Sequence, residues 1–320
     1  MKGLTDIPGI AVGHASDYEG LTGCTVILCE KGAVAGVDVR GGATGTEELL
    51  VAEPGHVADR VHAVVFAGGS AFGLEAASGV RKFLEQKGVG FETQVARVPI
   101  VPAAILFDLA IGKASARPTR EMGEAAAAAA STGPVQEGAV GAGTGATVGK
   151  MLGMKCAMKS GVGSATVWLG GPNEGVAVAA LAAVNAFGDV REPSTGKIVA
   201  GARRAPDSRE WLDMERHLVG AGRERSQPWN TTLVCVATNA AFSRVQTSRL
   251  AQMAQVGLAR TISPVHTMFD GDLVFAFSFG DRKADLTAVG VAAVQAVEQA
   301  ILRAVRMAPS LGGVPGLKAG

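Results

Sequence analysis

Two runs in the last third of the chain are apolar at almost every position. They are Thr232–Thr238 (TLVCVAT) and Leu273–Phe279 (LVFAFSF). A strand with one face in water alternates apolar and polar residues, whereas a strand covered on both faces is apolar throughout. The chain is therefore expected to build a sheet with structure packed on both of its faces.

Helix-like segments alternate with the strand-like ones. Four segments have helical spacing or propensity: Ala71–Gly88, Ala125–Ala130, Ser243–Arg260 and Asp285–Met307. Three more short runs are expected to be strands: His62–Ala67, and Cys24–Cys29 with Ala33–Val39, the last two joined as a hairpin at Lys31-Gly32. This order predicts an α/β fold with layers of helices outside sheets.

Composition limits the function classes. Lys plus Arg number 30 and Asp plus Glu number 29, so no basic field exists to hold a nucleic acid. No run reaches about 18 apolar residues, so no membrane-spanning helix is expected. The N-terminal residues lack the apolar core of a secretory signal. No composition shift divides the chain, and residues 1–320 are expected to form one domain, with an exposed connector from about Gly220 to Asn230.

The four cysteines predict neither disulfides nor a metal site. They are Cys24, Cys29, Cys156 and Cys235, and no two form a CxxC pair. The five histidines have no metal-binding spacing either. We therefore expect reduced, buried thiols in a cytoplasmic protein without metal or other cofactor.

Glycine-rich motifs give only weak functional signals. The run Gly141–Lys150 looks like a phosphate-binding loop, but Thr144 stands where that motif has glycine and Met151 stands where it has Ser or Thr. Ser70 follows Gly68-Gly69 like a nucleophile elbow, but Phe72 replaces the second glycine. Neither nucleotide binding nor a serine triad is favoured.

The end of the polar connector offers a different nucleophile. It delivers Asn230 and Thr231 to the first position of the buried strand. If the bond between them were cut, Thr231 would carry both a hydroxyl and a free α-amine, whose pKa of about 7.7–8.0 lets it accept the hydroxyl proton without a histidine. A simple Asn-Thr turn that starts a strand fits the same residues, so both interpretations stay open.

A pair of carboxylates precedes the second buried strand. Asp270 and Asp272 flank Gly271, and side chains at i and i+2 share a face of an extended segment. Both could then point at one small target, such as an ammonium and a hydroxyl. A solvated Asp-Gly turn, or half of a calcium loop without its other oxygen ligands, fits equally.

Longer motifs, taken in order along the chain, resemble the DmpA-type aminopeptidases, which include β-peptidyl aminopeptidases and nylon-oligomer hydrolases. The matching segments are Gly3–His14, Thr22–Leu28, Gly36–Gly42, Gly68–Leu74, Val98–Pro102, Gly141–Ala146, Asn230–Thr238 and Phe269–Asp272. The resemblance implies a four-layer αββα sandwich similar to N-terminal-nucleophile hydrolases. It also implies self-cleavage at Asn230–Thr231 into an α chain 1–230 and a β chain 231–320.

The same resemblance implies an activity and an assembly. Relatives release N-terminal amino acids from small peptides, amides or esters without a metal, and they form homo-oligomers of αβ pairs. A tetramer or larger assembly that binds a small peptide or amide, and neither nucleic acid nor membrane, is therefore expected.

Individual roles follow from the resemblance as well. Thr231 would be the nucleophile, and Asp270 with Asp272 would hold it and its amine, as in the nylon-hydrolase branch; the peptidase branch has Ser at the first of these positions. Asn185 matches an oxyanion-stabilising asparagine, and Lys159 aligns with a lysine near the nucleophile. Two rival functions remain: an acyltransferase of the ornithine-acetyltransferase type, and an uncleaved binding protein without activity.

Overall fold

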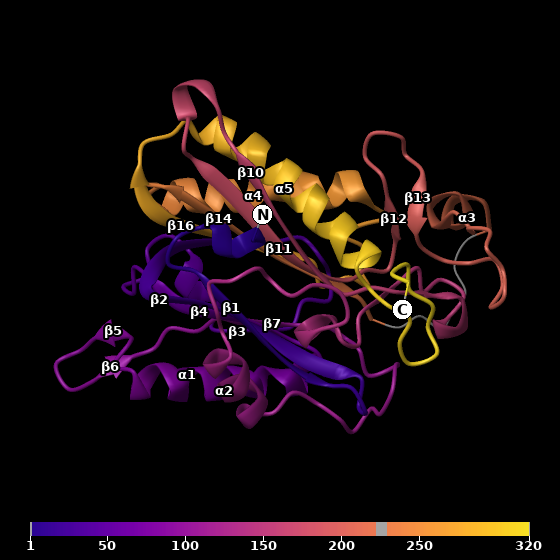
Figure 1. Cartoon of the computed structure of the whole chain (residues 1–320), viewed down its shortest axis with the longest axis horizontal. Coiled ribbons are helices and arrows are strands. Elements are labelled where there is room, and N and C mark those ends of the chain that lie inside the picture. The colour runs from indigo at the N-terminus through magenta and orange to yellow at the C-terminus, as the bar shows by residue number, and fades with distance from the viewer. Residues whose placement is uncertain (1, 222–228, 320) are drawn as a thin grey trace.

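The buried strands lie inside a sandwich of four layers. The computed structural model describes residues 2–221 and 229–319, and in it two sheets stack between two pairs of helices (Figure 1). The outer pairs are α1 (Ala76–Gln86) with α2 (Arg120–Ala128), and α4 (Arg244–Thr261) with α5 (Leu286–Arg306). The expected αββα sandwich is therefore confirmed.

The sheet under α4 and α5, here called the α4/α5 sheet, contains both apolar runs. Its strand order is β10-β11-β14-β16-β2. The first four are β10 (Val162–Trp168), β11 (Ala177–Asn185), β14 (Thr231–Ala240) and β16 (Leu273–Arg282). β14 and β16 are parallel and are connected through α4, whereas β11 is antiparallel to β14. The two predicted buried strands are thus confirmed as β14 and β16.

β2 (Thr22–Val39) links the two sheets, and here the predicted hairpin is wrong. It is one strand of 18 residues. Its first half pairs with β1 (Ala11–Asp17) and β4 (Val61–Ala67), and its second half pairs with β16. Gly32 has φ +77° and lies where the pairing register with β4 shifts. The Lys-Gly pair therefore makes a bulge that carries the strand from one sheet into the other, instead of a reversal.

The α1/α2 sheet consists of β1, the first half of β2, β4, β7 and β3. The remaining elements are short: β3 (Thr46–Glu47), β5 (Phe91–Glu92), β6 (Arg97–Val98), β7 (Ala103–Ile105), β8 (Thr147–Val148), β9 (Met158–Lys159), β12 (Asp189–Arg191), β13 (Ile198–Ala200), β15 (Ile262–Ser263) and α3 (Met214–Ala221).

Strand residues alternate between two cores. In β14, Val234 belongs to the core against α4 and α5, whereas Leu233 and Cys235 lie in the core between the sheets. Across that inner core, the rings of Phe66 in β4 and Phe275 in β16 stack with centroids 6.3 Å apart. Burial on both faces explains why these strands carry no polar alternation.

The predicted helices are present, with shifted starts. Ser243 caps α4 in a reciprocal capping box with Gln246, and Asp285 caps α5. The helix expected from Ala71 begins as a 3-10 turn, and α1 starts only at Ala76. Of the predicted connector, residues 222–228 lie outside the described part of the chain. All four cysteines are buried free thiols.

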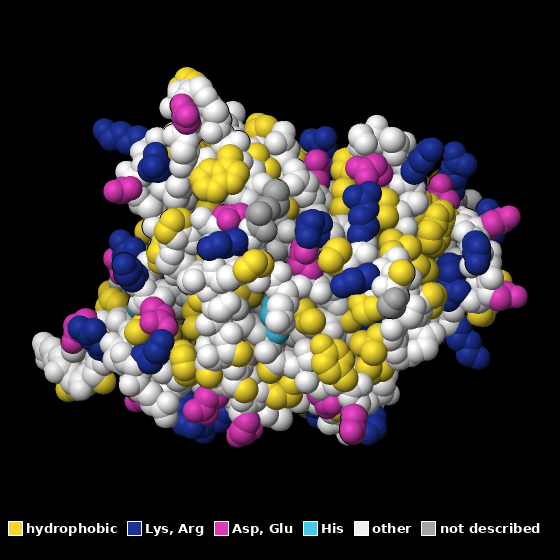
Figure 2. All heavy atoms as spheres, in the orientation of Figure 1, with side chains coloured by type: hydrophobic (Ala, Val, Ile, Leu, Met, Phe, Trp, Pro, Cys, Tyr) yellow, Lys and Arg dark blue, Asp and Glu magenta, His cyan; other side chains and the backbone are white. Residues whose placement is uncertain are grey.

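One described helix departs from the sequence-based expectation about membranes. α5 has the length and mean hydropathy of a membrane-spanning segment, but 67% of its apolar window is buried within the molecule. Its buried residues pack in the core with β10, β11 and α4, as expected for a helix of an outer layer that covers a sheet. On the face shown in Figure 2, basic and acidic side chains are interspersed and form no single-sign field.

Glycines allow α1 and α2 to cross at very short range. A Cβ atom added to Gly123 would overlap the carbonyl oxygen of Ala76, and one added to Gly79 would overlap that of Arg120. The two backbones therefore touch, and no other residue type fits at these positions without moving a helix.

We expect Gly123→Ala to lower the free energy of unfolding by about 1–3 kcal/mol, because the methyl group forces the helices apart. Helix propensity alone would favour alanine by about 1 kcal/mol, so the sign of the change is informative. Gly220→Ala in α3 is the control, since none of the described atoms outside its own helix backbone lies within 4 Å of the added Cβ there. Urea unfolding measures the free energy of unfolding of both variants. A Gly123→Ala protein that is as stable as the wild type, or more stable, would contradict the close crossing of the two helices.

Candidate active site

The ends of three neighbouring strands meet at one edge of the α4/α5 sheet. β14 and β16 are parallel, so their first residues lie together, and antiparallel β11 ends at the same edge. Thr231, the first residue of β14, is paired directly with Asn185, the last residue of β11. Asp270 and Asp272 lie in the segment that enters β16. The topology thus gathers four of the five side chains to which the resemblance gives a catalytic role.

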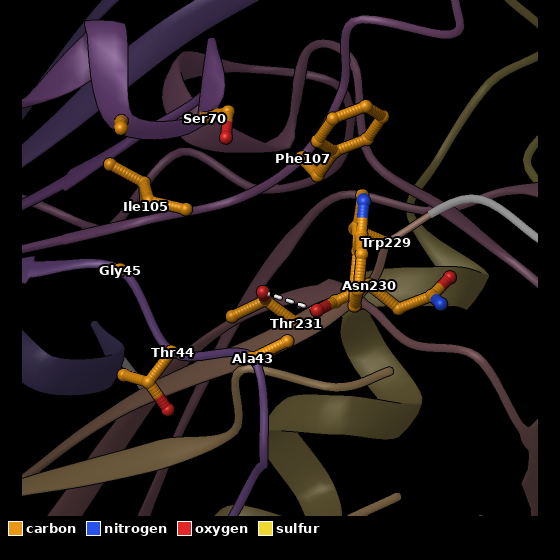
Figure 3. A pocket seen from close by; sticks show the side chains of 10 residues that line it. Ala43, Thr44, Gly45, Ser70, Ile105, Phe107, Trp229, Asn230 and Thr231 are labelled. Carbon is orange, nitrogen blue, oxygen red and sulfur yellow. Dashed lines mark hydrogen bonds between the residues drawn. The ribbon is translucent and has the colours of Figure 1, made fainter. Parts of the chain in front are cut away.

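The peptide bond before Thr231 is held by defined hydrogen bonds. The Thr231 hydroxyl donates to the carbonyl oxygen of Asn230, and the Gly271 N–H donates to the same oxygen at 2.9 Å (Figure 3). The Asn230 N–H donates to the carbonyl oxygen of Phe269 at 2.8 Å. This arrangement places a hydroxyl beside a carbonyl group that a fixed amide already polarises.

A cavity of about 400 Å³ opens in front of this bond. It is lined by Ala43, Thr44, Gly45, Ser70, Ala71, Ile105, Phe107, Trp229, Asn230 and Thr231. Ser70 and Thr231 lie on opposite sides of it (Figure 3). Ser70 has φ +55°, a conformation that is uncommon for residues other than glycine and is often found at ligand sites.

Both carboxylates are buried and bound by N–H groups. Asp270 accepts from the backbone N–H of Phe187 at 3.2 Å and of Thr267 at 3.1 Å. Asp272 accepts from the N–H of Thr232 at 2.6 Å and from His266 at 3.1 Å. Each side chain is 1% exposed. A calcium half-loop or a solvated turn is excluded by this geometry, because the oxygens are turned toward protein donors.

Within the described ranges, the hydrogen bonds of the two carboxylates reach Thr232 from Asp272, and Phe187 and Thr267 from Asp270, but not the Thr231 side chain. In the intact chain, Asp272 binds the N–H of Thr232, one residue beyond the candidate nucleophile. Among the described residues, no cluster of three or more His, Cys, Asp or Glu side chains could hold a metal ion.

A lysine that the sequence did not single out fixes the amide of Asn185. Lys150 Nζ donates to Asn185 Oδ1 at 2.8 Å and to its backbone oxygen at 2.9 Å, and the Thr147 N–H donates to Oδ1 as well. Asn185 Nδ2 then donates to the Phe107 carbonyl oxygen at 2.9 Å. Burial lowers the pKa of Lys150 to about 7, opposed by the nearby Asp270. Only the rejected phosphate-loop pattern had drawn attention to this residue.

Lys159 has a different environment. Its Nζ donates to the carbonyl oxygens of Gly143, Ala146 and Ser160, at 2.9, 2.8 and 2.6 Å. It thereby ties the Gly141–Ala146 loop to β9, and burial lowers its pKa to about 7. Of the two buried lysines, Lys150 is the one whose hydrogen bonds reach Asn185.

The buried carboxylate of Asp270 predicts a pH-dependent stability. Burial, and secondly the neighbouring Asp272, raise its pKa from 3.8 to about 7. The folded protein then holds the proton longer than the unfolded chain, so stability decreases as the pH rises from about 4 through 7. Asp270→Asn should remove this decrease in stability, because the amide does not titrate.

With Thr231→Ala as the common parent, we expect the Tm of Asp270→Asn to rise relative to that parent between pH 5 and pH 8. Differential scanning calorimetry measures the difference, and Asp281→Asn, an exposed carboxylate, is the control for removing one charge. A Tm difference that stays constant over this range would show that the pKa is not raised.

Comparisons with known proteins agree with this geometry. The family model of peptidase family S58 matches residues 2–319. An uncharacterized aminopeptidase of Mycobacterium tuberculosis is 39% identical, over 98% of this chain and 96% of its own. The 6-aminohexanoate-oligomer endohydrolase of Kocuria sp. is 30% identical, and the match covers 94% of this chain and 85% of the relative.

A solved structure has the same fold. The L-aminopeptidase D-Ala-esterase/amidase of Ochrobactrum anthropi, described as a variant of the N-terminal-nucleophile hydrolase fold, superposes with a TM-score of 0.72 at 21% sequence identity. The superposition covers 98% of this chain and 88% of that one. The chain therefore belongs to peptidase family S58, the DmpA family, and is a hydrolase that has a variant of the N-terminal-nucleophile hydrolase fold.

Proposed function

We propose that this chain cuts itself between Asn230 and Thr231 and then hydrolyses the amide bonds of small peptides and amides with Thr231 as nucleophile. One observation carries the proposal: the Thr231 hydroxyl contacts the Asn230 carbonyl group, which the Gly271 N–H also binds, at the wall of a cavity. The products would be an α chain 1–230 and a β chain 231–320 that stay together within one domain.

Self-cleavage follows from this contact. Thr231 Oγ attacks the Asn230 carbonyl carbon, and the Gly271 N–H stabilises the oxyanion, a donor worth about 3–4 kcal/mol in comparable sites. The carbon–nitrogen bond breaks, and the hydroxyl proton passes to the Thr231 nitrogen, which leaves an ester and a free amine. Water then hydrolyses the ester, giving the Asn230 carboxylate and regenerating the Thr231 hydroxyl.

Turnover uses the same hydroxyl. The Thr231 α-amine accepts its proton while Oγ attacks the substrate carbonyl. The substrate amine departs with that proton, and water, activated by the α-amine, releases the acyl group from the ester. Each cycle consumes one water and cleaves one amide bond.

The remaining residues position these groups. An amide NH₂ has two hydrogens, and Asn185 donates one to Phe107, so the other is assigned to the substrate oxyanion. Asp272, bound to the Thr232 N–H, and Asp270 hold the start of β14 and the new amine. Lys150 keeps the Asn185 oxygen turned away from the substrate. Lys159 holds the Gly141–Ala146 loop through its hydrogen bonds. We therefore assign it a structural role and no direct contact with the nucleophile.

Family membership supports hydrolysis over the two rival functions, acetyl transfer and binding without catalysis. A homo-oligomer of αβ pairs, a tetramer or larger, belongs to the same proposal, and light scattering of the purified protein measures it. A cytoplasmic location is also proposed, and the four buried free thiols agree with it.

Replacing the nucleophile separates the proposed functions. We expect Thr231→Ala to remain a single full-length chain on denaturing electrophoresis and to lose hydrolysis of aminoacyl p-nitroanilides, because both steps need the hydroxyl. Thr231→Ser should still cleave itself, since a hydroxyl remains. Two fragments or residual turnover from Thr231→Ala would refute the nucleophile, and a wild-type chain that stays whole and inactive would favour a binding protein.

Removing the lysine behind Asn185 tests the positioning role. We expect Lys150→Met to lower kcat by about 10–100-fold with KM nearly unchanged, because the Asn185 amide loses the partner that orients it. Lys155→Met, an exposed lysine nearby, is the control. A kcat equal to that of the control, with self-cleavage intact, would show that Lys150 is not needed for orientation.

A further inference from the structure

The turn that brings Ser70 to the cavity has its backbone donors already in use. The N–H groups of residues 68–70 donate in turn to the Gly23 carbonyl oxygen at 2.9 Å, to Asp108 Oδ1 at 2.6 Å and to the Leu106 carbonyl oxygen at 2.9 Å. These N–H groups therefore do not form an oxyanion hole, as those of a nucleophile elbow do. The polar group that the turn offers to the cavity is the Ser70 hydroxyl, whose oxygen is directed into it (Figure 3).

Ser70 keeps an unfavourable backbone conformation at this place. Its φ is +55°, and the preceding Gly69 has φ +78°. Glycine adopts such a conformation freely, whereas a residue with a Cβ atom does so at a cost in free energy. The chain has glycine at the first of these two positions and serine at the second, which points to a use for the serine side chain.

A buried carboxylate holds the turn from the side away from the cavity. Asp108 is 3% exposed, and besides the Gly69 N–H it accepts the Thr22 hydroxyl at 2.8 Å. A Cβ atom added to Gly68 or to Gly145 would overlap Asp108 Oδ2. The carboxylate is thus enclosed by hydrogen-bond donors and by close backbones, and it cannot turn without moving the segment that carries Ser70.

The segment that contains Asp108 also reaches the other side of the site. The Leu106 carbonyl oxygen accepts the Ser70 N–H, and the carbonyl oxygen of the next residue, Phe107, accepts Asn185 Nδ2 at 2.9 Å. Three consecutive residues therefore bind both the turn of Ser70 and the amide of Asn185. This segment sets the positions of the two groups relative to each other.

The intact chain shows on which side of the scissile bond Ser70 lies. This step rests on the proposed function, in which the acyl residue of a substrate takes the place of Asn230. Asn230 is 1% exposed and its side chain points away from Ser70, whereas the cavity lies between Ser70 and Thr231 (Figure 3). The leaving group of a substrate, which begins at the scissile nitrogen, therefore fills the cavity beside Ser70.

We propose that the Ser70 hydroxyl binds the leaving group of the substrate, and that Asp108 is the positioning residue that fixes this hydroxyl. A hydroxyl both donates and accepts, so it matches the amide that follows the scissile nitrogen in a peptide. The site thereby prefers leaving groups that carry such an amide over purely apolar amines.

Two substrates with the same acyl residue test the hydroxyl. Alanyl-alaninamide has an amide in its leaving group, whereas alanyl anilide has only an apolar ring there. For self-cleaved Ser70→Ala, we expect kcat/KM for alanyl-alaninamide to fall by about 5–10-fold, mainly through a higher KM, and that for alanyl anilide to stay within about twofold. Ser70→Gly, which adopts the same φ without strain, should show the same selective loss.

The outcomes separate this inference from the proposed function. Equal losses on both substrates, or no loss on either, overturn the role of Ser70 while Thr231 remains the nucleophile. A Ser70→Ala chain that no longer cleaves itself also overturns it, because the leaving nitrogen of self-cleavage belongs to Thr231 and does not enter the cavity. Cleaved wild-type enzyme that hydrolyses neither substrate overturns the proposed function as well.

Replacing the carboxylate tests the positioning role. Asp108→Ala removes the acceptor of the Gly69 N–H, so we expect the same selective loss of about 5–10-fold on alanyl-alaninamide. Asp108→Asn should stay within about twofold of wild type, because its amide oxygen still accepts that N–H and its amide nitrogen donates to the Thr22 hydroxyl.

A double variant shows whether Asp108 acts through Ser70. In a Ser70→Ala background, Asp108→Ala should not change the ratio of the two kcat/KM values further, because the hydroxyl that it positions is already absent. A further change of this ratio, or a selective loss in Asp108→Asn as large as that in Ser70→Ala, would overturn the positioning role.

Discussion

The pairing of β14 with its two neighbours is the constraint on which the site depends. β16 runs parallel to β14, so the segment that carries Asp270 and Asp272 must lie beside Thr231, and antiparallel β11 must end there with Asn185. The turn before β16 completes the arrangement, because His266 and Thr267 bind the Asp272 and Asp270 side chains. Because both faces of the sheet are buried, a shift of register would move the whole apolar set of β14 to the wrong core, and this fixes the position of Thr231.

Burial then sets the electrostatics of the same edge. The pKa of Lys150 falls and that of Asp270 rises, so both groups move toward neutrality where water is excluded. The oxygens that matter are instead bound by amide N–H groups, Gly271 on the Asn230 carbonyl and Thr232 on Asp272. Fixed dipoles of this kind need no reorganisation during a reaction.

The sequence predicted the layers well and the connections less well. Unbroken apolar runs identified β14 and β16, and helical spacing identified α4 and α5, which cover them. The Lys31-Gly32 pair was misread, because the same residues serve a turn or a bulge and only the pairing partners decide which. The residue pattern itself pointed to Thr231 and to the two carboxylates, and the resemblance added Asn185. The contact of Lys150 with Asn185 was missed, since it spans 35 residues and no local pattern encodes it.

The central claim is that catalysis begins only when Thr231 becomes a chain terminus. The most direct test follows freshly made protein by intact-mass spectrometry and assays amide hydrolysis on the same samples over time. The account predicts that fragments 1–230 and 231–320 accumulate and that activity increases in proportion to the cleaved fraction. Full activity in protein whose Asn230–Thr231 bond is still intact, or cleavage at another bond, would contradict it.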